Sequence, residues 1–266
     1  MFYNLIEGKI SINGLETDYI SFGRGKRPLI MIQGLNTNGI RGAGLGLAYA
    51  YRIFAKDFKI YLFDRQPVLH DNVTIREMAK DIAAAMDGLN IKKAAILGVS
   101  QGGMIAEYLA IDRPDLVDRL ILAVTASRTN DIVTECINGW IRMTENEDYS
   151  SLVADMAEKM YSEKYLKTYK PLLPLLTIIQ KPKDKERFIT LAKSCLSCNA
   201  YDELNKIQCP TLVIGGGKDK ILGKEASIEI AERLGCEKHI YENLGHAAYE
   251  EARDFNKRVY EFLYTD

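Results

Sequence analysis

The sequence contains no long apolar run. Its richest apolar stretch, residues 172–179, is interrupted by Pro174, whereas a membrane-spanning helix needs about 18 consecutive apolar residues. Residues 1–7 lack the basic start and the apolar core of a secretory signal peptide. We therefore expect a cytoplasmic protein with no membrane partner.

A strong charge of either sign is also missing. Lysine plus arginine number 35 and aspartate plus glutamate number 36, which leaves a formal net charge of −1. No basic stripe runs along the chain, although proteins that bind nucleic acids usually carry one. This balance argues against a nucleic-acid partner and favours a small-molecule substrate.

Cysteine is scarce and scattered. The five cysteines are an odd number, as expected for free thiols in a reducing compartment. Cys195 and Cys198 form the one close pair, and they lie in a helical pattern with neither a second pair nor a histidine nearby. We expect buried thiols at these positions and no metal site.

A nucleotide-binding glycine motif is absent as well. Residues 34–46 are rich in glycine, but Gly42, Gly44 and Gly46 do not have the G-x-G-x-x-G spacing and lie far from the preceding apolar run. We therefore expect no nucleotide and no other cofactor.

Short apolar runs alternate with helical patterns along most of the chain. Buried strands are predicted at residues 29–32, 59–63, 94–99, 116–124, 210–215 and 237–241. Helices are predicted at residues 47–55, 74–89, 104–111, 225–234 and 247–264. Thr74 and Glu77 predict a capping box at the start of the second of these helices. A hairpin through Asn13-Gly14 precedes them. This alternation is typical of a parallel sheet covered by helices on both faces.

Residues 126–206 interrupt the alternation, because helical patterns dominate there and no strand candidate occurs. We interpret this block as a helical lid inserted into one α/β core domain, which residues 1–125 and 207–266 form. Tyr161, Tyr165 and Tyr169 recur at one-turn spacing within the lid. Two interpretations of this tyrosine row stay open, namely packing between helices and lining of a pocket.

The sequence Gly98-x-Ser100-x-Gly102 stands where an apolar run meets a helical pattern. This order is that of a nucleophile elbow, a sharp turn that exposes a serine at its apex. Glycines two residues before and after the serine fit such a turn, since a Cβ atom would collide across it. The start of the following helix directs a partial positive charge toward whatever Ser100 attacks.

A serine hydroxyl needs a base, and the base needs an acid to hold it. His246 lies in a loop after the last predicted strand, whereas His70 precedes the elbow and His239 lies within a strand. Asp219 likewise follows a strand, and Asp64 is its rival by position. Because active sites of parallel sheets form at the carboxyl ends of strands, we predict the triad Ser100, Asp219 and His246.

Three blocks of this sequence resemble the α/β-hydrolase superfamily: residues 98–103, residues 209–219 and residues 244–246. The resemblance is nearest to small esterases, lactonases and cofactor-free peroxidase-like members, and it implies an eight-stranded sheet with a helical cap. It also implies an oxyanion hole made by the backbone N–H groups of Leu35 and Gln101. The chain departs from many relatives at Gln33-Gly34, where they have His-Gly.

We interpret the protein as a serine hydrolase that cleaves a small or medium carboxylic ester through an acyl-serine intermediate. Met156, Met160, Tyr161 and Tyr165 of the lid are expected to line the substrate pocket. The alternatives are hydrolysis of lactones, thioesters or carbon–carbon bonds, formation of peracids, and slow turnover by a receptor for a small ligand. The fold alone does not choose among them, because it supports many reactions.

Overall fold

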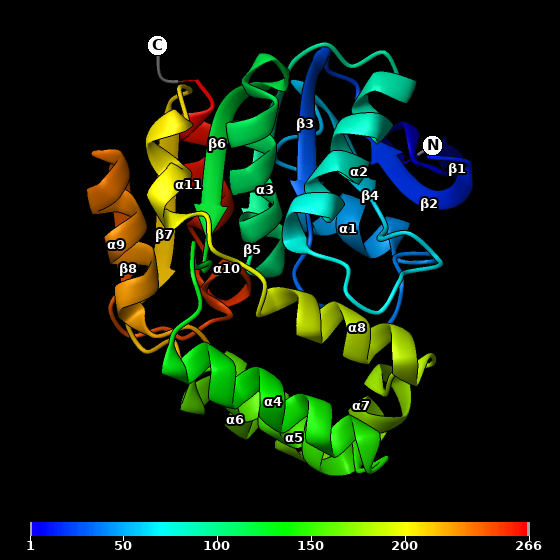
Figure 1. Ribbon diagram of the computed structural model, residues 1–266, viewed down its shortest axis with the longest axis vertical. Coiled ribbons are helices and arrows are strands. Elements are labelled where there is room, and N and C mark those ends of the chain that lie inside the picture. The colour runs from blue at the N-terminus through cyan, green and yellow to red at the C-terminus, as the bar shows by residue number, and fades with distance from the viewer. Residues whose placement is uncertain (1, 265–266) are drawn as a thin grey trace.

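The computed structural model describes residues 2–264, apart from the side chains of Phe2, Tyr169, Lys170 and Leu173. Eight strands form one sheet in the order β1-β2-β4-β3-β5-β6-β7-β8 (Figure 1). The strands are β1 (Ile6–Ile12), β2 (Leu15–Phe22), β3 (Arg27–Ile32), β4 (Phe58–Phe63), β5 (Ala94–Val99), β6 (Val117–Ala123), β7 (Thr211–Gly216) and β8 (Glu237–Tyr241). Strand β2 runs antiparallel to β1 and β4, and the other neighbours are parallel. The predicted, mostly parallel eight-stranded sheet is thus confirmed.

Helices cover both faces of the sheet. One face carries α2 (Ile75–Gly88), α3 (Gln101–Asp112) and α9 (Lys224–Leu234), and the other carries α1 (Gly44–Ala50), α10 (Ala248–Glu251) and α11 (Phe255–Phe262). Alternate residues of a strand point to opposite faces. In β5, Ile96 joins the core under α2 and α3, and Leu97 joins the core under α1 and α11. Such two-sided burial explains why β5 is apolar throughout.

A block of helices between β6 and β7 lies across the carboxyl ends of the strands (Figure 1). It consists of α4 (Asp131–Glu145), α5 (Tyr149–Met160), α6 (Glu163–Tyr169), α7 (Leu173–Gln180) and α8 (Lys185–Cys195), with a 3₁₀ turn between α6 and α7. Within the described part of this block, one isolated bridge joins Arg128 to Asn199 and no longer strand forms. The block therefore faces the edge of the sheet where loops gather.

Local sequence signals account for several of the elements. Thr74 caps helix α2 and forms the predicted capping box with Glu77, since each side chain accepts a hydrogen bond from the other residue's backbone N–H. Asn13 and Gly14 both have positive φ, at 51° and 83°, as the turn of a two-residue hairpin requires. These short-range predictions are confirmed.

Two helix predictions were wrong, one in its bounds and the other in its continuity. Helix α1 begins at Gly44 and ends at Ala50, where residues 47–55 had been expected. The closing helix is two helices, because the chain is extended at Ala252 between α10 and α11. The Tyr241 hydroxyl on β8 donates a hydrogen bond of 3.0 Å to Asp254, which holds this break against the sheet.

The start of helix α3 lies against strand β3. A Cβ atom added at Gly102 would come within 2.0 Å of the carbonyl oxygen of Ile32. One added at Gly98 would come within 2.5 Å of the carbonyl oxygen of Gly102. Only glycine permits backbone segments to approach so closely. The turn between β5 and α3 therefore depends on these two residues.

We expect Gly102→Ala to destabilise the fold, because neither backbone segment can yield to the new methyl group. Strain of this kind costs about 1–3 kcal/mol, which lowers Tm by several degrees in a chain of this size, at about 2–4 °C per kcal/mol. The matched control is Gly46→Ala in α1, where an added Cβ meets no atom within 4 Å. There alanine should raise Tm slightly, since it restricts the unfolded chain. Thermal unfolding followed by circular dichroism measures both changes.

Candidate active site

The backbone of Ser100 adopts a strained conformation between β5 and α3. Its φ is 54° and its ψ is −122°, a region that residues other than glycine seldom occupy. The Ser100 N–H donates to the carbonyl of Ala123 at 2.9 Å, and the Thr125 hydroxyl donates to the Ser100 carbonyl at 2.7 Å. Strand β6 and the residues after it thus hold the turn in place.

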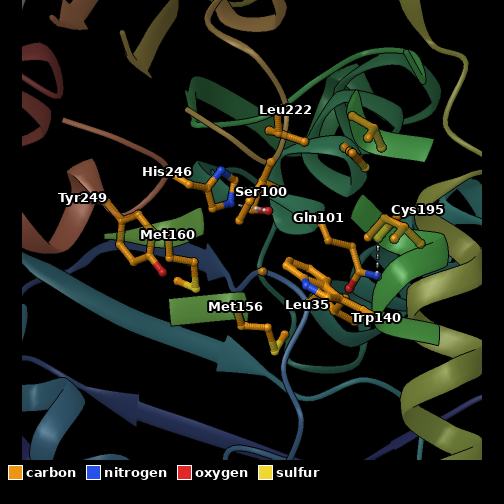
Figure 2. A pocket seen from close by; sticks show the side chains of 15 residues that line it. Leu35, Ser100, Gln101, Trp140, Met156, Met160, Cys195, Leu222, His246 and Tyr249 are labelled. Atoms are coloured by element: carbon orange, nitrogen blue, oxygen red, sulfur yellow. Dashed lines mark hydrogen bonds between the residues drawn. The ribbon is translucent and has the colours of Figure 1, made fainter. Parts of the chain in front are cut away.

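Three side chains from different loops meet at this turn. Ser100 Oγ lies 2.9 Å from Nε2 of His246 (Figure 2), and Nδ1 of His246 lies 2.8 Å from a carboxylate oxygen of Asp219. Asp219 follows β7, and His246 follows β8. A carboxylate oxygen only accepts, so Nδ1 of His246 donates to it. Nε2 is thereby left free to accept the serine proton.

The acid and the imidazole are shielded from solvent. The side chain of His246 is 4% exposed and that of Asp219 is 3% exposed. The second carboxylate oxygen of Asp219 accepts hydrogen bonds from the backbone N–H groups of Ile221 and Leu222, at 2.8 and 3.0 Å. Two backbone groups thus hold the carboxylate in one orientation. The orientation of the imidazole is therefore fixed as well.

The rival residues lie in other environments. Asp64 accepts hydrogen bonds from the backbone of Ile40 and Arg65 and lies 3.4 Å from Arg187. His70 lies 3.4 Å from the carboxylate of Glu77 at the surface. His239 packs edge-on against Tyr241, and burial lowers its pKa. The structure brings none of these three into the contacts made by Ser100.

Leu35 and Gln101 border the space in front of Ser100. Gln101 is the first residue of α3, where a backbone N–H has no partner within the helix. Leu35 follows β3, and the glycine before it approaches the elbow closely: a Cβ added at Gly34 would lie 3.2 Å from the Ser100 Cβ. Both residues line the same cavity as Ser100. These are the positions expected of two backbone N–H groups that donate hydrogen bonds to a substrate oxygen in the cavity.

The side chain of Gln101 ties the elbow to helix α8. Its Nε2 donates to the Leu191 carbonyl at 2.8 Å, and its Oε1 accepts from Arg65, which also donates to the Gln33 carbonyl at 2.6 Å. Burial lowers the pKa of Arg65 to about 10, so that the guanidinium still carries its charge at neutral pH. Arg65 therefore anchors the loop that holds Leu35. Sequence reasoning missed it, because a charged residue after a strand gives no sign of burial.

A partly open cavity of about 50 Å³ lies beside Ser100 (Figure 2). Its lining includes Leu35, Met104, Val133, Ile137, Trp140, Met156, Met160, Cys195, Ile221, Leu222 and Tyr249. Aliphatic, sulfur-containing and aromatic side chains dominate, and no lysine, arginine, aspartate or glutamate belongs to the lining among the described residues. Met156 and Met160 line the cavity, where the sequence analysis had expected them.

Tyr161 and Tyr165 do not line this cavity, so their predicted place there was wrong. Helix α5 ends at Met160 and the backbone of Tyr161 is extended, which breaks the single helical face that the spacing implied. The two rings stack on each other at 4.8 Å, and the Tyr161 hydroxyl donates to Glu250 on α10 at 2.7 Å. Their role is packing between the helical block and the core. The Tyr169 side chain lies outside the described residues.

Residues 27–144 match the family model of the alpha/beta hydrolase fold. The chain has the α/β-hydrolase fold. A crystal structure of the enol-lactonase from Burkholderia xenovorans LB400 superimposes with a TM-score of 0.84 at 22% identity, covering 97% of this chain and 100% of that one. The resemblance to the α/β-hydrolase superfamily is thus confirmed.

Curated relatives of this chain are hydrolases. A putative carbamate hydrolase, RutD, from Caulobacter sp. (strain K31) is 24% identical over 204 residues, which span 74% of this chain and 76% of the relative. The 2-hydroxy-6-oxononadienedioate/2-hydroxy-6-oxononatrienedioate hydrolase of Paraburkholderia xenovorans (strain LB400) is 24% identical over 263 residues, which span 94% and 91%. The second likeness spans nearly the whole chain, so it includes the helical block.

Trp140 and Tyr249 complete the cavity of the hydrolase, and the sequence analysis had not assigned them. Trp140 is the single tryptophan of the chain, and its indole N–H donates to Asp155 at 2.7 Å, which fixes the ring. Burial raises the pKa of the Cys195 thiol to about 11, so this cavity residue stays protonated and weakly nucleophilic at neutral pH. A lone tryptophan on an amphipathic helix was the available signal for Trp140.

The sequence analysis also made predictions about the cysteines, about a metal site and about membrane spans. All five cysteines are free thiols, and Cys195 and Cys198 are both buried. Across residues 2–264, no group of three or more histidine, cysteine, aspartate or glutamate side chains could hold a metal ion. No helix in that range is long and apolar enough to cross a membrane.

We expect a fluorophosphonate probe to label this hydrolase at one residue, Ser100. Among the described residues, only the Ser100 hydroxyl contacts a buried histidine. Intact-protein mass spectrometry should show a single adduct on the wild type and none on Ser100→Ala. Ser194→Ala is the matched control, since Ser194 is also near Gln101 but donates to a backbone carbonyl. Equal labelling of Ser100→Ala at another serine would contradict the assignment.

Proposed function

We propose that the protein hydrolyses a small, uncharged carboxylic ester through an acyl-Ser100 intermediate. The observation that carries this proposal is the unbroken hydrogen-bonded series from Ser100 through His246 to Asp219, beside an apolar cavity. Serine as the attacking residue favours acyl transfer.

Acylation begins when Ser100 Oγ attacks the ester carbonyl carbon. The hydroxyl proton passes to Nε2 of His246, and Asp219 stabilises the imidazolium that forms. The carbonyl oxygen becomes an oxyanion, which the N–H groups of Leu35 and Gln101 would bind. Each such donor contributes about 3–4 kcal/mol to the transition state. Collapse of the intermediate breaks the bond to the alcohol oxygen, which leaves with the proton from His246.

Deacylation repeats the same steps with water. His246 removes a proton from the water as its oxygen attacks the acyl carbon, and the oxyanion forms again at the same two N–H groups. When the tetrahedral intermediate collapses, Ser100 Oγ takes back the proton and the carboxylic acid leaves. No group other than the residues named is needed for either half of the reaction.

The cavity lining supports a neutral acyl group. A carboxylate buried there would lose its hydration without gaining a cation, and burial of an unpaired charge is costly. The relative from Paraburkholderia xenovorans is named for a dicarboxylate, a dienedioate. Arg65 does not serve such a charge here, because Gln101 stands between its guanidinium and the cavity and accepts its hydrogen bond. Substrates of the two proteins should therefore differ.

Residues 126–206 form the cap in this proposal, and residues 1–125 and 207–266 form the core domain. Val133, Ile137, Trp140, Met156 and Met160 all come from the cap and all face the cavity. The cap would thus select the acyl group, whereas the core supplies the reacting groups. The five free thiols support a reducing compartment, and hence the cytoplasm, as the place of action.

The acid assignment predicts a large loss of activity in Asp219→Asn. An asparagine in this position can offer its NH₂ group to Nδ1, which favours the wrong imidazole tautomer and should lower kcat about 10⁴-fold. Asp64→Asn should change kcat less than about tenfold, because Asp64 makes no described contact with His246. Steady-state turnover per folded protein, measured on both variants, ranks the two acids. A reversed ranking would move the acid to Asp64.

The charge of the acyl group provides the test of substrate class. We expect kcat/KM for p-nitrophenyl butyrate to exceed that for p-nitrophenyl hemisuccinate by about 10²-fold or more, since the cavity would have to bury the free carboxylate of the latter unpaired. The leaving group is the same in both esters, so the comparison isolates the acyl side. Equal values would contradict the neutral-acyl proposal.

Two variants in the cap test whether the cavity residues set the preference among acyl groups. Met156→Ala enlarges the cavity and should shift preference toward longer acyl chains by about tenfold or more, at about 1–3 kcal/mol per methylene-sized contact. Tyr165→Ala removes a stacked ring outside the cavity, so it should lower Tm and leave the order of esters unchanged.

A further inference from the structure

Helix α7 exposes an apolar face to solvent. This face consists of Leu172, the residue that precedes the helix, and Leu175, Ile178 and Ile179, and the four are between 46% and 69% exposed. Their spacing of three, three and one residues puts them on one side of the helical segment. Leu176 and Thr177 are half-buried, and α7 packs against α5. Single exposed aliphatic residues are ordinary, but four within eight positions mark a surface that binds something.

Lysines flank the apolar face of α7 on both sides in the sequence. Residues 164–183 contain five lysines and no aspartate or glutamate, in a chain whose formal charge is −1. Lys164, Lys167, Lys181 and Lys183 are exposed. Among the described residues, none of these four lies within ion-pair distance of a carboxylate, whereas the nearby Lys185 and Arg187 do. The positive charge is therefore available to a partner.

The combination of exposed aliphatic side chains and unpaired lysines indicates which kind of partner binds this face. A second copy of the chain, docked symmetrically on the same face, would bring two sets of unpaired lysines together. A bilayer that contains anionic lipids instead accepts aliphatic side chains at the boundary of its headgroups and attracts lysines to its phosphates. We propose that the apolar face of α7 docks this protein on an anionic lipid bilayer.

The placement of α7 relates the docking surface to the cavity. Asn38 Nδ2 donates to the carbonyls of Ile179 and Lys181, both at 3.4 Å, and Asn38 Oδ1 accepts from the Lys183 N–H at 3.3 Å. Asn38 stands three residues after Leu35, which lines the cavity. Docking therefore brings the loop beside the active site close to the lipid surface. The sequence had predicted no membrane partner from the lack of a spanning segment, but docking at the surface requires none.

Co-sedimentation with vesicles tests the proposal. The full chain should bind vesicles of phosphatidylcholine mixed with phosphatidylglycerol and bind vesicles of phosphatidylcholine alone at least tenfold more weakly. Binding should weaken as salt rises, because salt screens the lysines. Ile178→Ser should weaken binding about tenfold or more through lost apolar burial, and Lys181→Gln about fivefold. Leu45→Ser is the control, since Leu45 on α1 is 64% exposed without belonging to this face.

Three results would overturn the proposal: no binding to mixed vesicles, equal binding to both kinds, or equal weakening by Leu45→Ser. A dimer in analytical ultracentrifugation that Ile178→Ser dissociates would assign the face to a second copy and overturn it too. Thermal unfolding shows that each variant folds, and turnover of a short water-soluble ester should be unchanged in Ile178→Ser. Vesicle binding is measured without any substrate, so its failure is distinct from failure of the proposed ester hydrolysis.

Discussion

The close approach of strand β5, helix α3 and strand β3 is the constraint on which the site depends. Gly98 and Gly102 have no space for a Cβ atom, and the backbone of Ser100 takes the strain of the turn between them. Strain of this kind costs about 1–3 kcal/mol and persists only where the surrounding structure enforces it. Here the enforcing contacts come from Ala123 and Thr125, so packing of the whole sheet holds one serine in place.

Burial strengthens the hydrogen bonds around His246. A water-filled site would screen the contact between Asp219 and the imidazole, whereas the nearly closed environment does not. The same burial explains Arg65, which stays charged but has its pKa lowered, and which fastens Gln33 and Gln101 behind the cavity. Polar groups thus hold the hydrolase site from behind, while apolar groups form the space in which a substrate would react.

Sequence reasoning succeeded where a signal was local and failed where it depended on distant partners. The capping box at Thr74 and the hairpin turn at Asn13 involve residues within one turn of each other, so the pattern nearly determines the geometry. The row formed by Tyr161 and Tyr165 had the spacing of a helix, but α5 ends at Met160 and the Tyr161 hydroxyl donates to Glu250 on α10. Such a contact, 89 residues apart, leaves no periodic trace.

The sequence by itself determined the fold class, since short apolar runs in alternation with helices can be buried only in a two-sided parallel sheet. It also singled out Ser100, Asp219 and His246, because parallel strands place the loops that follow them at one edge. The tertiary structure decided which residues of the helical block face Ser100 and that Arg65 lies buried behind it. Those outcomes follow from how helices pack across the sheet, and packing between remote segments is set by the complete three-dimensional arrangement of side chains.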